Sequence, residues 1–148
     1  KEGKTSSEII SALNEMKKVS DAYFMADDLS HLQRSGRLSG AQAVVGSLLQ
    51  VKPLLHFEDK VIVPFQKIRT YKKVVSRMYE LFDEYYKQHE GEHITVCVLH
   101  VDALDKAEEI KKYVEENYTN VTVDIDEISP VISTHLGLGA VAIGWTIL

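Results

Sequence analysis

The chain has 148 residues, of which 45% are hydrophobic and 26% are charged, and its formal net charge is −5. This length and composition predict one ordinary globular domain with a hydrophobic core of its own. The acidic balance argues against nucleic acid as a partner, since phosphate binding needs an accumulated positive field. No apolar run approaches the length of about eighteen residues that a membrane span requires, and no signal-peptide pattern is found.

Hydrophobic periodicity predicts helices and strands along the whole chain. In chain order, the expected elements are a helix over 5–18, a strand over 21–26, a short helix over 29–33, a helix from a Ser39 cap to Leu49, a hairpin of strands 51–57 and 61–68, a long helix over 69–88, a strand over 94–101, a helix over 106–118, a strand over 121–127, a short helix over 131–135 and a last strand over 140–147. Ser6 or Ser7 is the expected cap of the first helix. Two prolines within the hairpin favour edge or bulged strands.

These elements predict an α+β fold class. Six strands with interspersed helices favour a two-layer domain with a mixed six-stranded sheet. Residues 121–126 alternate apolar and polar side chains, as does the strand of Trp145, which indicates helices mainly on one face of the sheet. Trp145, in the last strand, is expected to be a packing residue.

A zinc-binding motif and a nucleophilic cysteine are both rejected because of the residues that surround them. The segment from His89 to His93 matches the zinc-protease pattern H-E-x-x-H, which needs a continuing helix, but Gly91 weakens that helix and a β-branched strand follows at once. The single cysteine, Cys97, lies in that strand, where we expect a buried, inert thiol. One cysteine also excludes an internal disulfide and fits a reducing cytoplasm, the expected location.

The most informative stretch is residues 133–141, where His135 precedes a Gly-x-Gly turn formed by Gly137 and Gly139. Glycine tolerates positive φ and lets a ligand approach the backbone closely, and imidazole can donate or accept a hydrogen bond. His135 is therefore either a satisfied histidine at a helix end or a polar group for the head of a greasy ligand. The turn is no dinucleotide fingerprint, because it leads into a strand instead of a helix.

A second glycine turn lies at Gly36, between Arg34 and Arg37. The two arginines are either solvated helix-capping residues or, beside the helix that begins after Ser39, a seat for a carboxylate or a phosphate.

Four segments carry a resemblance to a known family. They are Asp28-Leu29-x-x-Leu32-x-Arg34-x-Gly36-Arg37-Leu38-Ser39, Leu48-Leu49-x-Val51-Lys52-Pro53-Leu54-Leu55, Lys67-x-Arg69-Thr70 and His135-x-Gly137-x-Gly139. As a set, in this order and spacing, they resemble the DegV family of bacterial fatty-acid-binding proteins. The resemblance implies that residues 1–148 are a DegV-like C-terminal domain. It also implies that an N-terminal α/β domain, whose Thr and Ser hydroxyls hold the fatty-acid carboxylate in the family, is absent from this chain.

The resemblance further assigns the site. It makes His135 the histidine on the carboxylate side, Gly137 and Gly139 its glycine turn, and Arg37, with Ser39 beside it, an element near the bound ligand. The family usually has proline between the two glycines, whereas this chain has Leu138, which removes one constraint on the turn.

The implied function is that of a carrier. Members of the family bind a long-chain fatty acid and present its carboxylate to a separate ATP-dependent fatty acid kinase, which phosphorylates it for lipid synthesis. We therefore expect no catalytic residue, no metal and no cofactor besides the bound fatty acid, and the sequence contains no phosphate-binding loop. The chain alone is expected to expose apolar surface, which favours a homodimer.

Two other functions stay open at this point. One is a regulatory or interaction domain without lipid, and its DNA-binding form is disfavoured by the acidic charge. The other is a small-molecule enzyme with His135 as general base, although no paired nucleophile lies nearby in the sequence.

Overall fold

The computed structural model describes residues 3–27, 29–36 and 52–147. The expected helix between Ser39 and Leu49 lies outside these ranges, and so do Arg37 and Ser39 themselves.

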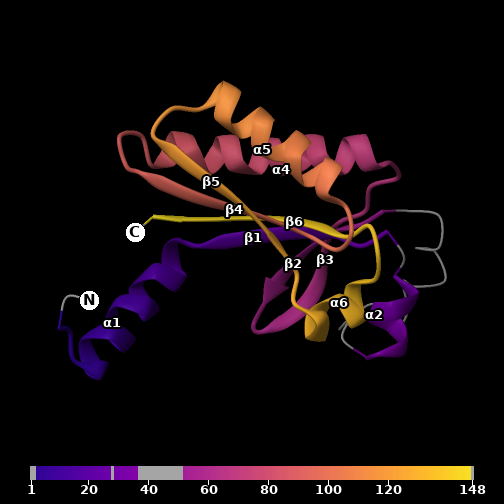
Figure 1. Ribbon diagram of the computed structural model, residues 1–148, viewed down its shortest axis with the longest axis horizontal. Coiled ribbons are helices and arrows are strands. Elements are labelled where there is room, and N and C mark those ends of the chain that lie inside the picture. The colour runs from indigo at the N-terminus through magenta and orange to yellow at the C-terminus, as the bar shows by residue number, and fades with distance from the viewer. Residues whose placement is uncertain (1–2, 28, 37–51, 148) are drawn as a thin grey trace.

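A six-stranded mixed sheet forms the centre of the molecule (Figure 1), with the strand order β3-β2-β1-β6-β4-β5. The strands are β1 (Asp21–Met25), β2 (Leu54–Glu58), β3 (Val61–Gln66), β4 (Ile94–His100), β5 (Val121–Glu127) and β6 (Val141–Ile147). All neighbouring strands are antiparallel except β4 and β5, which are parallel. The α+β fold and its mixed six-stranded sheet are thus confirmed, with strand ends shifted by no more than three residues.

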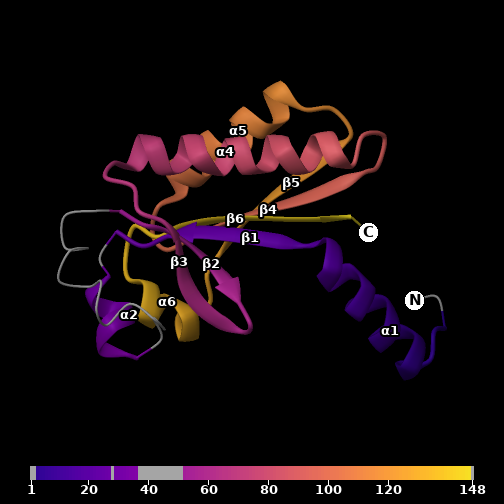
Figure 2. The ribbon, with the colours of Figure 1, turned by 180° about the vertical axis from the view of Figure 1, so that it is seen from behind.

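Two long helices cover one face of the sheet. The helices are α1 (Ser6–Met16), a 3₁₀ turn η1 (Lys17–Val19), α2 (Ser30–Arg34), α4 (Tyr71–Gln88), α5 (Leu104–Asn117) and α6 (Pro130–Leu136). α4 and α5 lie side by side above the sheet in Figure 1, whereas the short helices α2 and α6 lie together below it. Figure 2 shows the same arrangement from behind. The prediction of helices mainly on one face is confirmed.

Alternating side chains of the central strands build two separate cores. The larger core lies under α4 and α5, and its fully buried members include Met25, Leu54, Met78, Phe82, Ile94, Val96, Ile110 and Ile143. The smaller core lies under α2 and α6 and consists of Phe24, Ala26, Leu29, Leu32, Leu55, Leu136 and Ala140. We call these two sides of the sheet the α4 face and the α6 face. Trp145 is 4% exposed and packs on the α4 face, as expected for a packing residue.

The N-cap of helix α1 lies one residue before the expected one. Thr5, and not Ser6 or Ser7, is the N-cap, and its hydroxyl accepts a hydrogen bond from the N–H of Glu8. The Glu8 carboxylate in turn accepts from the N–H of Thr5 at 2.7 Å. Only a residue three positions before a glutamate can form this reciprocal capping box, which explains the choice of Thr5.

The hairpin of β2 and β3 turns tightly at Asp59 and Lys60. Both residues have positive φ, 48° and 68°, as a two-residue type I′ turn requires. Pro64 lies in β3, which is an edge strand, and the pairing register shifts between Leu54 and Leu55. The expectation that the prolines mark edge or bulged strands is therefore confirmed.

Helix α1 projects from one end of the sheet and buries none of its residues. Ile9, Ile10 and Leu13 are 46%, 60% and 46% exposed, so its apolar stripe has no cover within the described ranges. A helix of this length is marginal by itself in water, which makes its connection to the sheet important. The Tyr85 hydroxyl, on α4, donates a hydrogen bond to the carbonyl of Val19 at 2.5 Å and ties η1 to the core.

We expect Tyr85→Phe to lower the free energy of unfolding by about 1 kcal/mol, since it deletes this hydrogen bond and leaves the ring in place. Urea unfolding followed by circular dichroism measures the change. An unchanged unfolding midpoint would show that the bond contributes nothing to stability.

Candidate functional site

Helix α6 presents the candidate histidine at its C-terminal end. Pro130 occupies the first turn, where its missing N–H costs nothing, and the helix ends at Gly137 with φ +78°. The N–H of Gly137 donates to the carbonyl of Ser133 at 2.8 Å, which closes the last turn. His135 therefore lies in this last turn, one residue before the buried Leu136.

The Nδ1 atom of His135 is buried and has no hydrogen-bond partner among the described residues. Two other side-chain atoms share this property, Tyr71 Oη and Trp145 Nε1, and both belong to residues of the α4 face. A buried polar atom without a partner costs free energy, about 1–3 kcal/mol in proteins. Of the three residues, only His135 belongs to α6, where Val131 and Ile132 are exposed.

Exposed apolar side chains lie on α6, just after it, and on β2. They are Phe57, Val131, Ile132 and Leu138, with exposed fractions of 59%, 74%, 52% and 72%. Phe57 belongs to the α6 face, because its ring packs against Phe24 with centroids 5.2 Å apart. A buried polar atom without a partner among the described residues, beside exposed apolar side chains, suits a ligand with a polar head and an apolar tail.

Two side chains fill the space beside the glycine turn. A Cβ at Gly137 would lie 2.9 Å from the ring of His31, on α2, and a Cβ at Gly139 would lie 2.3 Å from the carboxylate of Asp27. Gly139 also has positive φ, +79°. Both positions thus require glycine for space as well as for conformation.

Asp27 is the centre of an ion-pair cluster just beyond β1. Its carboxylate accepts hydrogen bonds from Lys52 Nζ at 2.5 Å and from Lys106 Nζ at 3.0 Å. Lys106 also donates to the carbonyl of Gly139 at 3.2 Å and lies 5.0 Å from the ring centre of Tyr71. Partial burial would raise the pKa of Asp27, but the bonds and charges of the two lysines outweigh it and hold this pKa below its usual value.

This lowered pKa predicts a loss of stability in acid. A carboxylate whose pKa is lower in the folded state stabilises that state fully at pH values above its unfolded pKa, near 3.9. This stabilisation disappears as the pH falls through the pKa of the folded state. We expect Asp27→Asn to be less stable than the wild type by up to about 1 kcal/mol at pH 7. The difference between the two urea midpoints should shrink as the pH falls below the usual pKa of aspartate and Asp27 becomes protonated in the folded state. A difference that grows on acidification would contradict the assignment.

Three of the five predicted ligand-binding residues share this site. His135, Gly137 and Gly139 lie together at the end of α6, while Arg37 and Ser39 lie outside the described residues. Arg34 is exposed, and its guanidinium donates to the hydroxyl of Ser30 at 3.4 Å. Four further residues surround the turn and were not predicted from the sequence: His31, Asp27, Lys52 and Lys106. We call them the supports of the turn.

The rejected zinc motif is confirmed to lack a continuous helix. α4 ends at Gln88, and His93 lies in the connection that precedes β4. His93 contacts the Asn120 amide oxygen through Nδ1 and the Thr122 hydroxyl through Nε2, both at 3.1 Å. Within the described ranges, no group of three or more His, Cys, Asp or Glu side chains could hold a metal ion.

Cys97 is half-buried, which corrects the expectation of a fully buried thiol. Along β4 its neighbours Val96 and Val98 face the larger core, so its own side chain faces the other side of the sheet. Burial raises the pKa of Cys97, and the carboxylates of Asp124 and Asp126 raise it further. A thiol with a raised pKa is a poor nucleophile at neutral pH.

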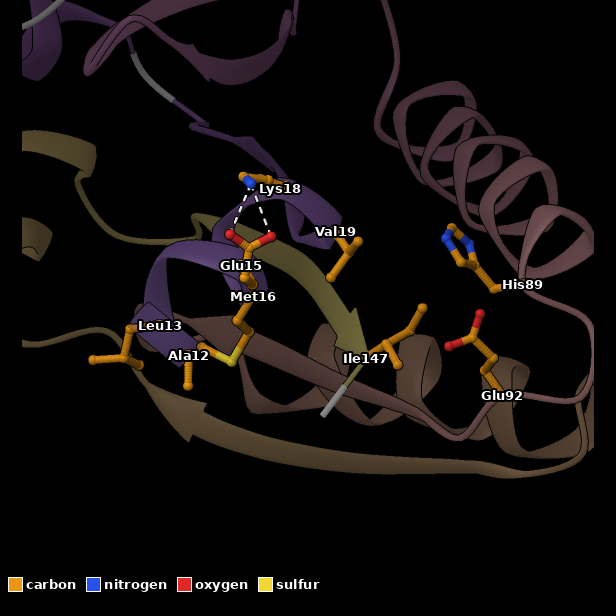
Figure 3. A pocket seen from close by; sticks show the side chains of 9 residues that line it. All are labelled: Ala12, Leu13, Glu15, Met16, Lys18, Val19, His89, Glu92 and Ile147. Carbon is orange, nitrogen blue, oxygen red and sulfur yellow. Dashed lines mark hydrogen bonds and ion pairs between the residues drawn. The ribbon is translucent and has the colours of Figure 1, made fainter. Parts of the chain in front are cut away.

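A hollow of about 640 Å³ lies at the opposite end of β6 from His135. Figure 3 shows its lining side chains, which include Leu13 and Met16 of α1, His89 and Ile147. β6 starts at Val141, just after the glycine turn, and ends at Ile147. Seven residues of strand separate the two places by roughly 20 Å, so this hollow is separate from the glycine turn and His135.

No helix in the described part of the chain is both long enough and apolar enough to cross a bilayer. Together, the described residues form an α+β domain with two long helices on one face of the sheet, and on the other face a histidine beside a glycine turn whose Nδ1 has no partner among them.

The chain belongs to the DegV family. The family model that matches residues 1–147 is described as "uncharacterised protein, DegV family". Protein DegV of Bacillus subtilis is 51% identical over 146 residues, which are 98% of this chain and 51% of that protein. The chain spans about half the length of the curated relatives it matches.

Solved structures of relatives share the fold. The crystal structure of DegV, a fatty acid binding protein from Bacillus subtilis, has a TM-score of 0.87 at 49% identity and covers 97% of this chain and 50% of that one. The fatty acid binding DegV family protein from Streptococcus agalactiae has a TM-score of 0.87 at 33% identity and covers 99% of this chain and 51% of that one.

Proposed function

We propose that the protein containing this chain binds a long-chain fatty acid and that His135 donates a hydrogen bond to its carboxylate. The observation that carries the proposal is the buried Nδ1 atom of His135, which has no partner in the described ranges. The fatty acid binding proteins from Bacillus subtilis and Streptococcus agalactiae, at 49% and 33% identity, support it.

The ligand's carboxylate cannot be buried without partners, because an unpaired charge in an apolar environment is strongly unfavourable. In our proposal, Arg37 and Ser39 supply further donors from the segment before β2, and Gly137 and Gly139 let the carboxylate approach the backbone closely. The acyl chain lies along the α6 face. Each methylene that leaves water there contributes about 0.8 kcal/mol.

A second domain belongs to the same proposal. The matched relatives are about twice as long as this chain, so a further domain of similar size would form the opposite wall of the pocket and supply Thr and Ser hydroxyls. The uncovered apolar stripe of α1, formed by Ile9, Ile10 and Leu13, supports this, because it needs a partner surface. When the chain is expressed by itself, the same stripe favours a homodimer.

We further propose that the protein is a carrier and not the catalyst. A separate ATP-dependent fatty acid kinase would phosphorylate the presented carboxylate, whose oxygen attacks the γ-phosphorus of ATP while ADP leaves. Such a kinase would require the protein to work in the cytoplasm, where ATP is available. Incubation of the oleate-loaded protein with the kinase and radiolabelled ATP should yield labelled acyl phosphate. An equal yield from free oleate without the protein would contradict the carrier role.

Native mass spectrometry tests the ligand proposal. We expect the full-length protein, purified from bacteria under mild conditions, to carry one non-covalent ligand with the mass of a long-chain fatty acid. Denaturation and extraction should release it for identification. A ligand-free protein that also fails to take up added oleate would refute the proposal.

A further inference from the structure

We propose that His31 and Asp27 are positioning residues of this site. The two side chains fill the space beside Gly137 and Gly139 and so hold the turn that follows His135. This inference rests on the proposed function of His135 and concerns what keeps its side chain in place.

The His31 ring lies directly against the Cα of Gly137. A Cβ at Gly137 would lie 2.9 Å from Cδ2 and 3.4 Å from Nε2 of that ring, so the smallest side chain would force the two apart. Gly137 cannot retreat freely, because it is buried and its N–H donates to the Ser133 carbonyl. The His31 ring therefore sets how closely the end of α6 approaches α2.

Asp27 holds the second glycine through two routes. Its Oδ2 atom lies only 2.3 Å from the position that a Cβ of Gly139 would occupy, so any larger residue there would collide with it. The same carboxylate orients Lys106, whose Nζ donates to the Gly139 carbonyl at 3.2 Å, while the Gly139 N–H donates to the Val101 carbonyl at 2.8 Å. Both backbone polar groups of Gly139 are thus engaged. Lys52, the second partner of Asp27, connects the cluster to the segment before β2.

His31 and Asp27 contact the turn on the side that faces the interior of the domain. Leu138, between the two glycines, is 72% exposed, so the tip of the turn faces outward. His135 lies one helical residue before the buried Leu136, and its ring position depends on where α6 ends. A binding group is precise only when neighbouring contacts fix its backbone. His31 and Asp27 contact Gly137 and Gly139, the turn at which the helix of His135 ends.

Double-mutant cycles in the full-length protein test the inference. One cycle combines Gly139→Ala with Asp27→Ala, and the other combines Gly137→Ala with His31→Ala. The cost of placing alanine at positive φ is common to both backgrounds of a cycle, so the coupling reports the contact alone. Gly91→Ala is the matched control, because Gly91 also has positive φ, +91°, but nothing lies within 4 Å of its would-be Cβ.

The first readout is the imidazole NMR signal of His135 without ligand, and the second is the dissociation constant for oleate. We expect each glycine substitution in the native background to shift the His135 signal and to weaken oleate binding at least fivefold. When His31 or Asp27 has already been replaced by alanine, the factor by which the glycine substitution weakens oleate binding should be at least threefold smaller. Gly91→Ala should change neither readout.

Asp27→Asn and Lys106→Met keep the test decisive if a glycine variant fails to fold. Both leave the glycines intact, remove the ion pair, and are expected to shift the His135 signal. Equal effects of the glycine substitutions in both backgrounds, together with an unshifted His135 signal in Asp27→Asn, would overturn the inference even if oleate binds tightly. If the wild type does not bind oleate, the proposed function falls, while the NMR readout still decides whether the supports position His135.

Discussion

The chain alone is expected to bind oleate roughly a thousandfold more weakly than the full-length protein. In our proposal a further domain of the full-length protein forms the opposite wall of the pocket, so part of the acyl chain would stay in water in the chain alone. Five uncovered methylenes at about 0.8 kcal/mol each amount to about 4 kcal/mol, which corresponds to this factor. The loss of the Thr and Ser hydroxyls acts in the same direction.

Isothermal titration of the two proteins with oleate measures the ratio. Thermal unfolding of the chain must be recorded alongside, so that weak binding is not confused with incomplete folding. A chain that folds cooperatively and binds oleate as tightly as the full-length protein would refute the two-domain proposal. Analytical ultracentrifugation of the same sample shows whether the uncovered α1 stripe makes the chain dimerise.

His135→Ala in the full-length protein is expected to weaken oleate binding at least tenfold. A hydrogen bond to a charged group contributes about 1.5–3 kcal/mol, and one factor of ten corresponds to about 1.4 kcal/mol. The fold should survive, because His135 is only half-buried and its Nδ1 forms no hydrogen bond within the described ranges. The expected result is therefore a change in affinity with little change in unfolding temperature.

His93→Ala is the matched control for this experiment. His93 is exposed and precedes Ile94, which pairs with Ile147 at the far end of β6. His100 is unsuitable as a control, since it is 4% exposed and its Nδ1 accepts the N–H of Ala103. If His135→Ala binds oleate normally but unfolds several degrees earlier, the histidine is a structural residue.

Local patterns were sufficient to predict the sheet. The alternation of residues 121–126 and the hairpin around Asp59 are properties of short segments, and both were located correctly. The cap of α1 was misassigned by one residue, because Thr5, Ser6 and Ser7 all carry a capping hydroxyl. Only the reciprocal bond with Glu8 distinguishes Thr5.

The supports of the site could not be predicted in the same way. Asp27 and Lys106 are 79 residues apart in the sequence, and nothing in either segment indicates the other. Their pairing depends on how the chain returns to one end of the sheet. Likewise, the spacing of Ile9 and Leu13 predicted a helix correctly, but periodicity does not reveal whether an apolar stripe is covered.

The central sheet separates the larger core from the face that carries His135. Met25 and Ala26 are adjacent in the chain but belong to different cores, and so do Leu54 and Leu55. Most of the buried apolar volume lies on the α4 face, away from His135. Side chains on the α6 face can therefore change while the packing of α4 and α5 stays intact, and in our proposal such changes would adapt the protein to other acyl tails. A laboratory library restricted to the exposed positions around α6 should accordingly yield mostly folded proteins with altered ligand preference.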